Sequence, residues 1–373
     1  MIIHQPLGGV ITYYARRCII MKKIILTGGG TAGHVTPNIA LVPKLKEAGF
    51  DIKYIGSYNG MEKQLVEKEG LNYVGISSGK LRRYFSWQNF TDPFRVIKGY
   101  FEARKIIKKY KPDVVFSKGG FVTVPVVMAA SAYKIPTIIH ESDMTPGLAN
   151  KIAMRYATKV CHTFPETAKF LGDKAVFTGS PLREELFKGN KVNALNMCSF
   201  TTDKPVLLVV GGSLGAKKVN DAIRAALPQL LEHFQVAHLC GKGKLDESLV
   251  GTKGYAQFEY ISDEMKDFFA MADIIVSRAG SNSICEIAAL NKPSVLIPLS
   301  ANASRGDQIL NAKSFEKQGF CEVIDEDTMT TDVLLDTIKK VYDNRADYIE
   351  SMRVSGLSNG VDTIISLIKD VTL

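Results

Sequence analysis

The sequence predicts an α/β protein with two Rossmann-like domains, each containing a parallel sheet, that face one another across a cleft. Two observations carry this prediction. Strand-like and helix-like segments alternate along all 373 residues, a pattern typical of parallel sheets covered by helices. A glycine-rich turn also follows a buried apolar run once in each half, at 28–34 and at 211–216. Such turns bring backbone N–H groups close to a ligand at the positive end of a helix.

The first half is expected to form six strands. A helix beginning near Thr36 and Pro37 follows the first glycine turn, because threonine can cap a helix and proline suits its first position. The strands are expected at Ile24–Thr27, Ile52–Ile55, Asp113–Phe116, Thr137–His140, Lys159–Cys161 and Ala175–Thr178.

The second half repeats this alternation. The helix after Gly215 carries apolar residues at helical spacing, namely Val219, Ile223, Ala226 and Leu230. The strands are expected at Val206–Val210, Val236–Leu239, Phe258–Ile261, Ile274–Ser277, Ser294–Pro298 and Glu322–Ile324.

The chain is expected to divide into an extension at 1–20, a first domain at 21–183 and a second domain at 184–355. Met21 is the expected natural start, since it directly precedes the first strand and residues 1–20 carry no motif. Residues 184–204 are polar and weakly patterned, which predicts a linker with a short helix. A final helix at 356–373 is expected to pack back on the first domain.

The composition is that of a soluble globular protein, with 46% apolar and 23% charged residues. Six cysteines without CxxC spacing indicate neither a disulfide framework nor a zinc site, and they fit a reducing compartment. Residues 1–183 carry 27 Lys and Arg against 12 Asp and Glu, whereas the rest of the chain is net acidic. The basic half therefore faces a polyanion, either nucleic acid or an anionic bilayer, unless its lysines serve only solubility.

The first glycine turn, Gly28-x-Gly30-x-x-Gly33, matches the dinucleotide-binding fingerprint in form. That fingerprint also needs an acid at the end of the second strand, where this chain has Ile55-Gly56-Ser57. A nicotinamide cofactor is therefore not expected. The turn retains exposed N–H groups and places His34 at the mouth of a helix, where an imidazole suits a general base. The alternative is a buried structural histidine.

Two motifs in the second half suit a nucleotide. The turn at 211–215 lacks the lysine of a P-loop, but its N–H groups, the Ser213 hydroxyl and the helix dipole can hold a diphosphate. Glu286 lies one to two turns into the helix that follows the strand at 274–277. A carboxylate there can accept hydrogen bonds from both hydroxyls of a ribose. The alternatives are a tight turn and a solvated glutamate. Asp325-Glu326-Asp327 matches a DxD metal signature, but we interpret it as a surface turn, so no metal is expected.

A basic and aromatic segment precedes a helix in the first half, and Phe90, Phe94, Ile97 and Phe101 then follow at helical spacing. It is either an amphipathic patch for anionic lipid or a core-facing helix with a basic edge. The charged and aromatic members of the segment are Lys80, Arg82, Arg83, Tyr84, Phe85 and Trp87.

Taken together, the motifs resemble those of the MurG family, whose bacterial members add N-acetylglucosamine to undecaprenyl-pyrophosphoryl-muramoyl-pentapeptide. The resemblance extends from Met21 to the end of the chain. Its carriers are the segments at 29–34, 117–121, 140–143, 146–151, 211–213 and 278–286, with Asp307-Gln308 before Asn311.

The resemblance implies a GT-B architecture, in which the active site lies between two Rossmann-like domains. It implies UDP-N-acetylglucosamine as donor, inversion at the anomeric carbon, no cofactor, no nucleic acid, and a peripheral position at the cytoplasmic face of the cell membrane. By match, Ser213 and Arg183 hold the diphosphate, the Ile261 backbone holds uracil and Glu286 holds ribose. The base is His34, or Asp143 if it lies near enough to the acceptor hydroxyl. The remaining matched residues bind substrate: Thr31, Ala32, Gly33, Asp143, Ser281, Asn282, Ser283, Asp307 and Gln308.

Two positions depart from the family pattern. Many relatives have His-Glu-Gln-Asn where this chain has His140-Glu141-Ser142-Asp143, and a carboxylate at the fourth position cannot donate to a sugar. Many also have Gln-Gln where this chain has Asp307-Gln308, so Gln308 is the better sugar contact. The rival functions are a UDP-sugar epimerase and a non-catalytic nucleotide-sugar-binding module.

Overall fold

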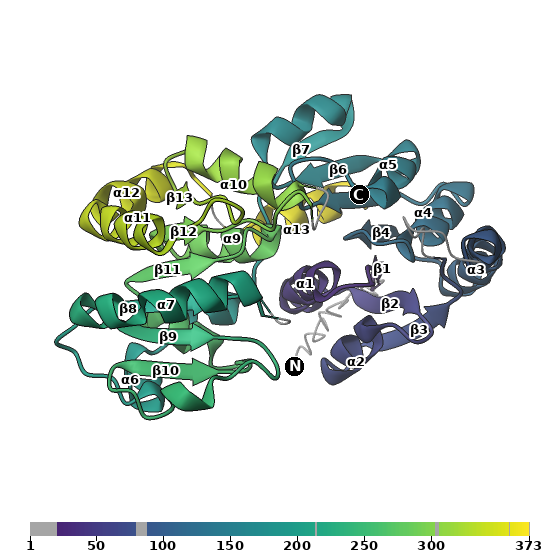
Figure 1. Cartoon of the computed structure of the whole chain (residues 1–373). Coiled ribbons are helices and arrows are strands. Elements are labelled where there is room, and N and C mark those ends of the chain that lie inside the picture. Colours follow the sequence, from purple (N-terminus) through teal and green to yellow (C-terminus); the bar gives the residue numbers. More distant parts are fainter. Residues whose placement is uncertain (1–20, 80–87, 213–214, 303–305, 358, 373) are drawn as a thin grey trace, which may run out of the picture.

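The computed structural model describes residues 21–79, 88–212, 215–302, 306–357 and 359–372. It contains two α/β domains, and Figure 1 shows them side by side with the first in purple to teal and the second in green to yellow. The expected extension at 1–20 and the basic aromatic segment at 80–87 lie outside the described residues.

The first domain contains a parallel sheet in the order β3-β2-β1-β4-β5-β6-β7. Side chains of β1 alternate between two cores: Ile24 and Leu26 pack under one layer of helices, and Ile25 packs under the other. The strands are β1 (Lys23–Thr27), β2 (Asp51–Ser57), β3 (Asn72–Ile76), β4 (Val114–Ser117), β5 (Thr137–Glu141), β6 (Lys159–His162) and β7 (Ala175–Phe177). The α-helices are α1 (Thr36–Glu47), α2 (Met61–Lys68), α3 (Gln88–Tyr110), α4 (Thr123–Ala132) and α5 (Leu148–Ala153).

The second domain contains a parallel sheet in the order β10-β9-β8-β11-β12-β13. Its strands are β8 (Val206–Val210), β9 (Gln235–Leu239), β10 (Tyr255–Phe258), β11 (Ile274–Ser277), β12 (Ser294–Leu296) and β13 (Cys321–Val323). Its α-helices are α6 (Lys191–Cys198), α7 (Lys217–His233), α8 (Met265–Met271), α9 (Ser281–Ala289), α10 (Asp307–Lys317), α11 (Thr331–Asp343) and α12 (Arg345–Val354). The predicted apolar face of α7 is buried at all four positions.

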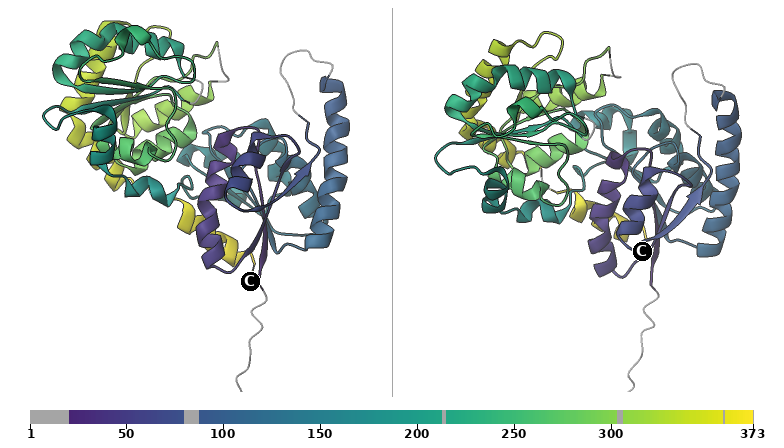
Figure 2. Two further views of the ribbon diagram at one scale, coloured as in Figure 1. Left: turned by 90° about the horizontal axis from the view of Figure 1, so that it is seen from below. Right: turned by 60° about the horizontal axis from the view of Figure 1, so that its bottom comes forward.

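The last helix, α13 (Val361–Asp370), packs on the first domain although it follows the second in sequence. Ile364, Ile365 and Ile368 belong to the same core as Ile24 and Leu26 of β1. Figure 2 shows this yellow helix beside purple α1. The two domains are therefore joined twice, through the linker after Arg183 and through the segment that leads into α13.

Three details differ from the sequence prediction. The edge strand β3 was not expected, because its side chains are mostly half-buried and a glycine interrupts them. β10 pairs with β9 over Tyr255–Phe258, which places it three residues before the expected strand. Thr36 does not cap α1, since the N-cap is Val35 and no side chain bonds the first turn.

Candidate active site

The candidate site lies where the glycine turn after β1 meets the N-terminus of α9. The Asn282 side-chain amide donates to the carbonyl of Gly33, 3.0 Å away, and the Ser281 hydroxyl donates to the carbonyl of Ser142. Both contacts join the carboxyl end of the first sheet to that of the second. Ligands of parallel α/β sheets bind at this edge.

A second set of contacts joins α10 to the loop after β5. The buried Asn311 accepts from the Met144 amide and donates to the Asp143 carboxylate, at 3.0 Å in each case. Farther along α10, Ser314 donates to Glu166, 2.9 Å away. The Asp143 carboxylate of the first domain therefore accepts a hydrogen bond from Asn311 of the second domain.

His34 lies at the end of the glycine turn, in the short 3₁₀ helix Ala32–His34 that leads into α1. Its Nδ1 is 3.0 Å from the Gly29 carbonyl and 3.1 Å from the Thr31 hydroxyl. Because a carbonyl oxygen only accepts, Nδ1 carries the proton in this arrangement. In the neutral ring, Nε2 then carries the lone pair that a general base needs.

The first glycine turn does not offer its amides to a ligand in the way the sequence predicted. The Gly29 amide donates to the Gly119 carbonyl at 3.3 Å, and the Gly30 amide donates to Glu62 at 3.2 Å. No acid was expected at the end of β2, but the Glu62 carboxylate reaches Ser57 there from α2. The expectation of exposed N–H groups is therefore wrong at Gly29 and Gly30.

A buried polar cluster lies behind this turn. The Lys118 ammonium donates to Nδ1 of His140 at 3.0 Å and to the Ser142 hydroxyl, and Nε2 of His140 donates to the Gly179 carbonyl at 2.8 Å. Burial lowers the pKa of Lys118 to about 8 and holds the pKa of His140 well below its usual range. Burial also raises the pKa of Glu141, and Asp143 adds to that effect. The cluster fixes the shape of the loop that contacts the second domain.

Glu286 on α9 and Arg183, at the end of the first domain, are close enough to interact electrostatically. Burial raises the pKa of Glu286 to about 7, and the nearby Arg183 acts in the opposite direction. Among the described residues, the buried Nε of Arg183 has no hydrogen-bond partner. A buried guanidinium N–H without a partner fits an anionic ligand at this position.

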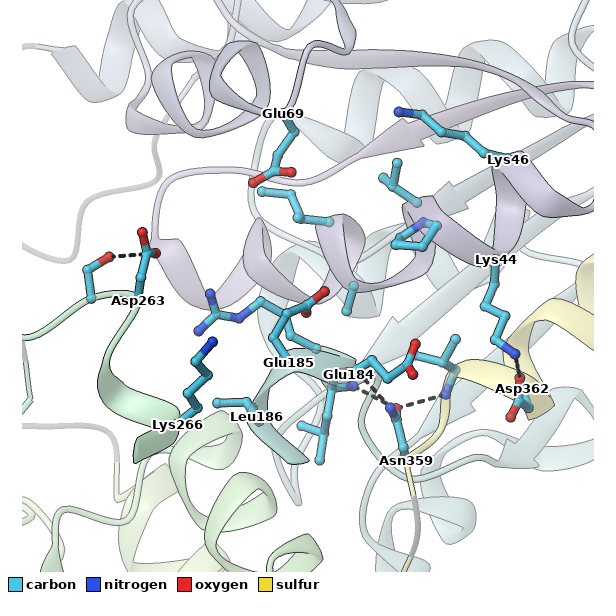
Figure 3. A pocket seen from close by; sticks show the side chains of 18 residues that line it. Lys44, Lys46, Glu69, Glu184, Glu185, Leu186, Asp263, Lys266, Asn359 and Asp362 are labelled. Carbon is cyan, nitrogen blue, oxygen red and sulfur yellow. Dashed lines mark hydrogen bonds and ion pairs between the residues drawn. The ribbon is translucent and has the colours of Figure 1, made fainter. Parts of the chain in front are cut away.

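A cavity of 790 Å³ opens between α1, the linker, α8 and α13, and Arg183 is part of its wall. Figure 3 shows Lys266 and Asp263 from the second domain opposite Glu69 and Lys44 from the first. Ser262, directly after Ile261, also lines it. Among the described residues, neither His34 nor Glu286 lines this cavity.

The other predicted binding residues have definite places. Ile261 is buried in the loop between β10 and α8, and Ser283 is in the first turn of α9. The Gln308 side-chain oxygen accepts from the Leu299 amide at 3.0 Å, so its NH₂ group is the part suited to a sugar hydroxyl. The Thr145 hydroxyl is 3.5 Å from the Asp307 carboxylate. Ser213 lies outside the described residues.

The acidic segment at 325–327 is more than a surface turn, since Glu326 is buried. Its carboxylate pairs with Arg278, which comes directly after β11 and also donates to the Ile297 and Pro298 carbonyls. Asp327 pairs with Lys218 at 2.8 Å. These carboxylates hold the segments around α9 and α7 in place.

Both halves of the chain are similar to domains of known glycosyltransferases. The glycosyltransferase family 28 N-terminal domain matches residues 24–162, and the family 28 C-terminal domain matches 206–367. A UDP-N-acetylglucosamine–N-acetylmuramyl-(pentapeptide) pyrophosphoryl-undecaprenol N-acetylglucosamine transferase from Lachnospira eligens is 64% identical over 94% of this chain and 99% of its own. The chain belongs to the MurG family of glycosyltransferases.

Further relatives support this membership. A protein with the same transferase name from Lachnoclostridium phytofermentans is 61% identical over 95% of this chain and all of its own. The crystal structure of MurG from Acinetobacter baumannii superimposes with a TM-score of 0.76 at 28% identity, covering 94% of this chain and 99% of that one. The GT-B fold expected from the resemblance is therefore confirmed.

Within this MurG-family fold, three buried polar residues beside the site were not singled out from the sequence as functional: Glu62, Lys118 and Asn311. Each makes its contacts with residues far along the chain, so no local pattern marks its role. Lys118 and Asn311 do fall within motifs that carry the family resemblance, and this was the one sequence feature that pointed to them.

Proposed function

We propose that the protein transfers N-acetylglucosamine from UDP-N-acetylglucosamine to undecaprenyl-pyrophosphoryl-muramoyl-pentapeptide, forming the lipid-linked disaccharide of peptidoglycan synthesis. The contact between Asn282 and Gly33 carries the proposal. This contact joins the His34 turn of one domain to the start of α9 in the other. It supports a site at the domain boundary in which His34 is the base and α9 binds the nucleotide.

The second domain holds the donor in this proposal. Glu286 accepts both ribose hydroxyls, the backbone of Ile261 pairs with uracil, and Arg183 and Ser213 bind the diphosphate. The N–H groups at the start of α9, from Ser281 to Ser283, face the same anion. Helix N-termini favour negative charge, so α7 and α9 stabilise the departing UDP without a metal ion.

The first domain presents the acceptor. Nε2 of His34 takes the proton of the acceptor hydroxyl while its oxygen bonds to the anomeric carbon of the donor sugar. The bond from that carbon to the diphosphate breaks, and its electron pair leaves with UDP. Attack from the face opposite the diphosphate inverts the anomeric carbon. Thr31, Ala32 and Gly33 line the acceptor side, while Asp307 and Gln308 face the transferred sugar.

The protein is proposed to work at the cytoplasmic face of the membrane, bound to an anionic bilayer surface. Phe94, Ile97 and Phe101 on α3 are 73%, 54% and 60% exposed, so these apolar side chains do not face the core. Arg95 and Lys98 are exposed beside them. Figure 2 shows α3 on the side of the first domain away from the second. No helix in the described ranges is long and apolar enough to cross a membrane.

Product analysis with labelled UDP-N-acetylglucosamine and the lipid-linked muramoyl acceptor tests this function. The proposal expects label in the lipid fraction as a β-linked disaccharide, together with one UDP per transfer. Conversion of the donor to an epimeric UDP-sugar without acceptor would favour the epimerase. Binding of the donor without any product would favour the non-catalytic module.

A further inference from the structure

A fully buried carboxylate, that of Glu62 on α2, lies against the glycine turn that carries His34. One oxygen accepts from the Gly30 amide at 3.2 Å, and the other accepts from the Ser57 amide at 2.9 Å and from the Ser57 hydroxyl. All three neighbours donate, so both carboxylate oxygens of Glu62 act as acceptors. A Cβ at position 29 would lie 2.6 Å from the Glu62 Oε1, so glycine is needed there to admit the carboxylate.

One peptide group connects this carboxylate to the imidazole of His34. The amide of Gly30 and the carbonyl of Gly29 belong to the same planar peptide, and they point in opposite directions. The amide donates to Glu62, and the carbonyl accepts from Nδ1 of His34 at 3.0 Å. A negative charge at the N–H end polarises the peptide and strengthens the hydrogen bond at its carbonyl end.

We propose that Glu62 is a positioning residue for His34, acting through the Gly29–Gly30 peptide. The proposal rests on His34 being the base of the proposed transfer. The carbonyl of Gly29 keeps the proton on Nδ1, so that Nε2 receives the proton of the acceptor hydroxyl. The charge of Glu62 then stabilises the imidazolium that forms, in the manner of the aspartate behind the histidine of a catalytic triad.

The same carboxylate also occupies an amide of the glycine turn that a nucleotide phosphate would otherwise bind. In a dinucleotide-binding domain, the turn amides receive a phosphate. Here the Gly30 amide donates to an internal anion, and the Gly29 amide donates to Gly119. The turn therefore serves as a rigid support for the residues from Thr31 to His34.

A double-mutant cycle separates this relay from a purely structural brace between β2 and the turn. The variants are Glu62→Gln, His34→Ala and the pair, with Glu67→Gln as control because Glu67 is exposed on the same helix. By analogy with partners that orient histidines at metal sites, Glu62→Gln is expected to lower kcat about 10- to 100-fold. We expect Glu62→Gln to keep a near-wild-type donor affinity by calorimetry, donor KM and melting temperature. We expect the control Glu67→Gln to keep a near-wild-type kcat.

The decisive comparison is made in the His34→Ala background, where Glu62→Gln is expected to change the residual kcat by less than about twofold. An equal loss in both backgrounds would show a brace that acts independently of His34, and wild-type kcat in Glu62→Gln would overturn the inference directly. Full kcat in His34→Ala alone would instead refute the proposed base. If Glu62→Gln lowers the melting temperature strongly, kcat is compared between Glu62→Gln and Glu62→Asp. Glu62→Asp keeps the charge and is expected to retain more kcat, and equal losses in the two variants would overturn the inference.

Discussion

The side-chain amide of Asn311 donates to the carboxylate of Asp143 across the boundary between the two domains, over 3.0 Å. Asn311 is fully buried, and its carbonyl oxygen also receives the backbone amide next to Asp143. A residue that departs from the family pattern is thereby assigned to holding the domains together. The Asp143 carboxylate accepts this hydrogen bond from Asn311. In this role Asp143 does not have to donate a hydrogen bond to a sugar.

Asp143→Ala is expected to weaken this contact. The loss of one hydrogen bond that leaves a buried partner unsatisfied costs about 1–3 kcal/mol, so kcat/KM is expected to fall about 5- to 150-fold. Asp143→Asn serves as the matched control, because its side-chain oxygen still accepts from Asn311. Transfer kinetics of the two variants check this, and equal losses in both would show that the charge of Asp143 matters and its acceptor oxygen does not.

Glu286 makes donor affinity depend on pH. Burial raises its pKa to about 7, so the free protein keeps this carboxyl protonated at pH values where an exposed glutamate is ionised. In the proposed donor site the ribose binds the ionised form of Glu286, and the association constant for UDP-N-acetylglucosamine is therefore expected to fall about tenfold from pH 8 to pH 6. Calorimetry with this donor avoids titration of a terminal phosphate.

The variants of Glu286 check the same assignment. Glu286→Ala loses two charge-assisted hydrogen bonds, each worth about 1.5–3 kcal/mol, and is expected to weaken UDP and UDP-sugar alike. Glu286→Gln is expected to bind more weakly than wild type with no pH dependence between 6 and 8. Persistence of the full pH dependence in Glu286→Gln would move its source to another residue.

Transfer is expected to survive chelation. In the proposed transfer, the helix N-termini of α7 and α9 and the Arg183 guanidinium provide the positive charge for the leaving diphosphate. In the acidic segment at 325–327, Glu326 already pairs with the Arg278 side chain and Asp327 with the Lys218 side chain. Initial rates with EDTA check this. Loss of transfer that Mg²⁺ or Mn²⁺ restores would require a metal site.

The exposed apolar side chains of α3 predict binding to anionic vesicles. Replacing Phe94, Ile97 and Phe101 with serine is expected to lower sedimentation with phosphatidylglycerol vesicles, and salt is expected to weaken binding of the wild type. The matched control is Val354→Ser, because Val354 is 70% exposed on α12 of the second domain. Trp87 fluorescence reports on the neighbouring segment, and a blue shift is expected. Unchanged sedimentation of the triple variant would place the membrane contact elsewhere.

The strands that are buried on both faces were predictable from the sequence, because runs such as Val206–Val210 are continuous and apolar. β3 was missed and β10 was displaced, and both lie at sheet edges where fewer neighbours select apolar side chains, although the other edge strands, β7 and β13, were expected near their observed positions. The site shows the same division. His34 follows a recognisable glycine turn after β1, and Glu286 lies in the helix that follows β11, whereas Glu62 contacts Gly30 from a different element. Such contacts depend on how α2 folds over the end of β2, which no local spacing records.

The most direct test of the account is the kcat of His34→Ala in transfer of labelled N-acetylglucosamine to the lipid-linked acceptor, measured beside its donor affinity. Loss of a general base is expected to lower kcat by about 10²- to 10⁴-fold, while the dissociation constant for UDP-N-acetylglucosamine stays within about twofold of wild type. Wild-type kcat in this variant would contradict the assignment of His34 and the arrangement of the cleft built on it.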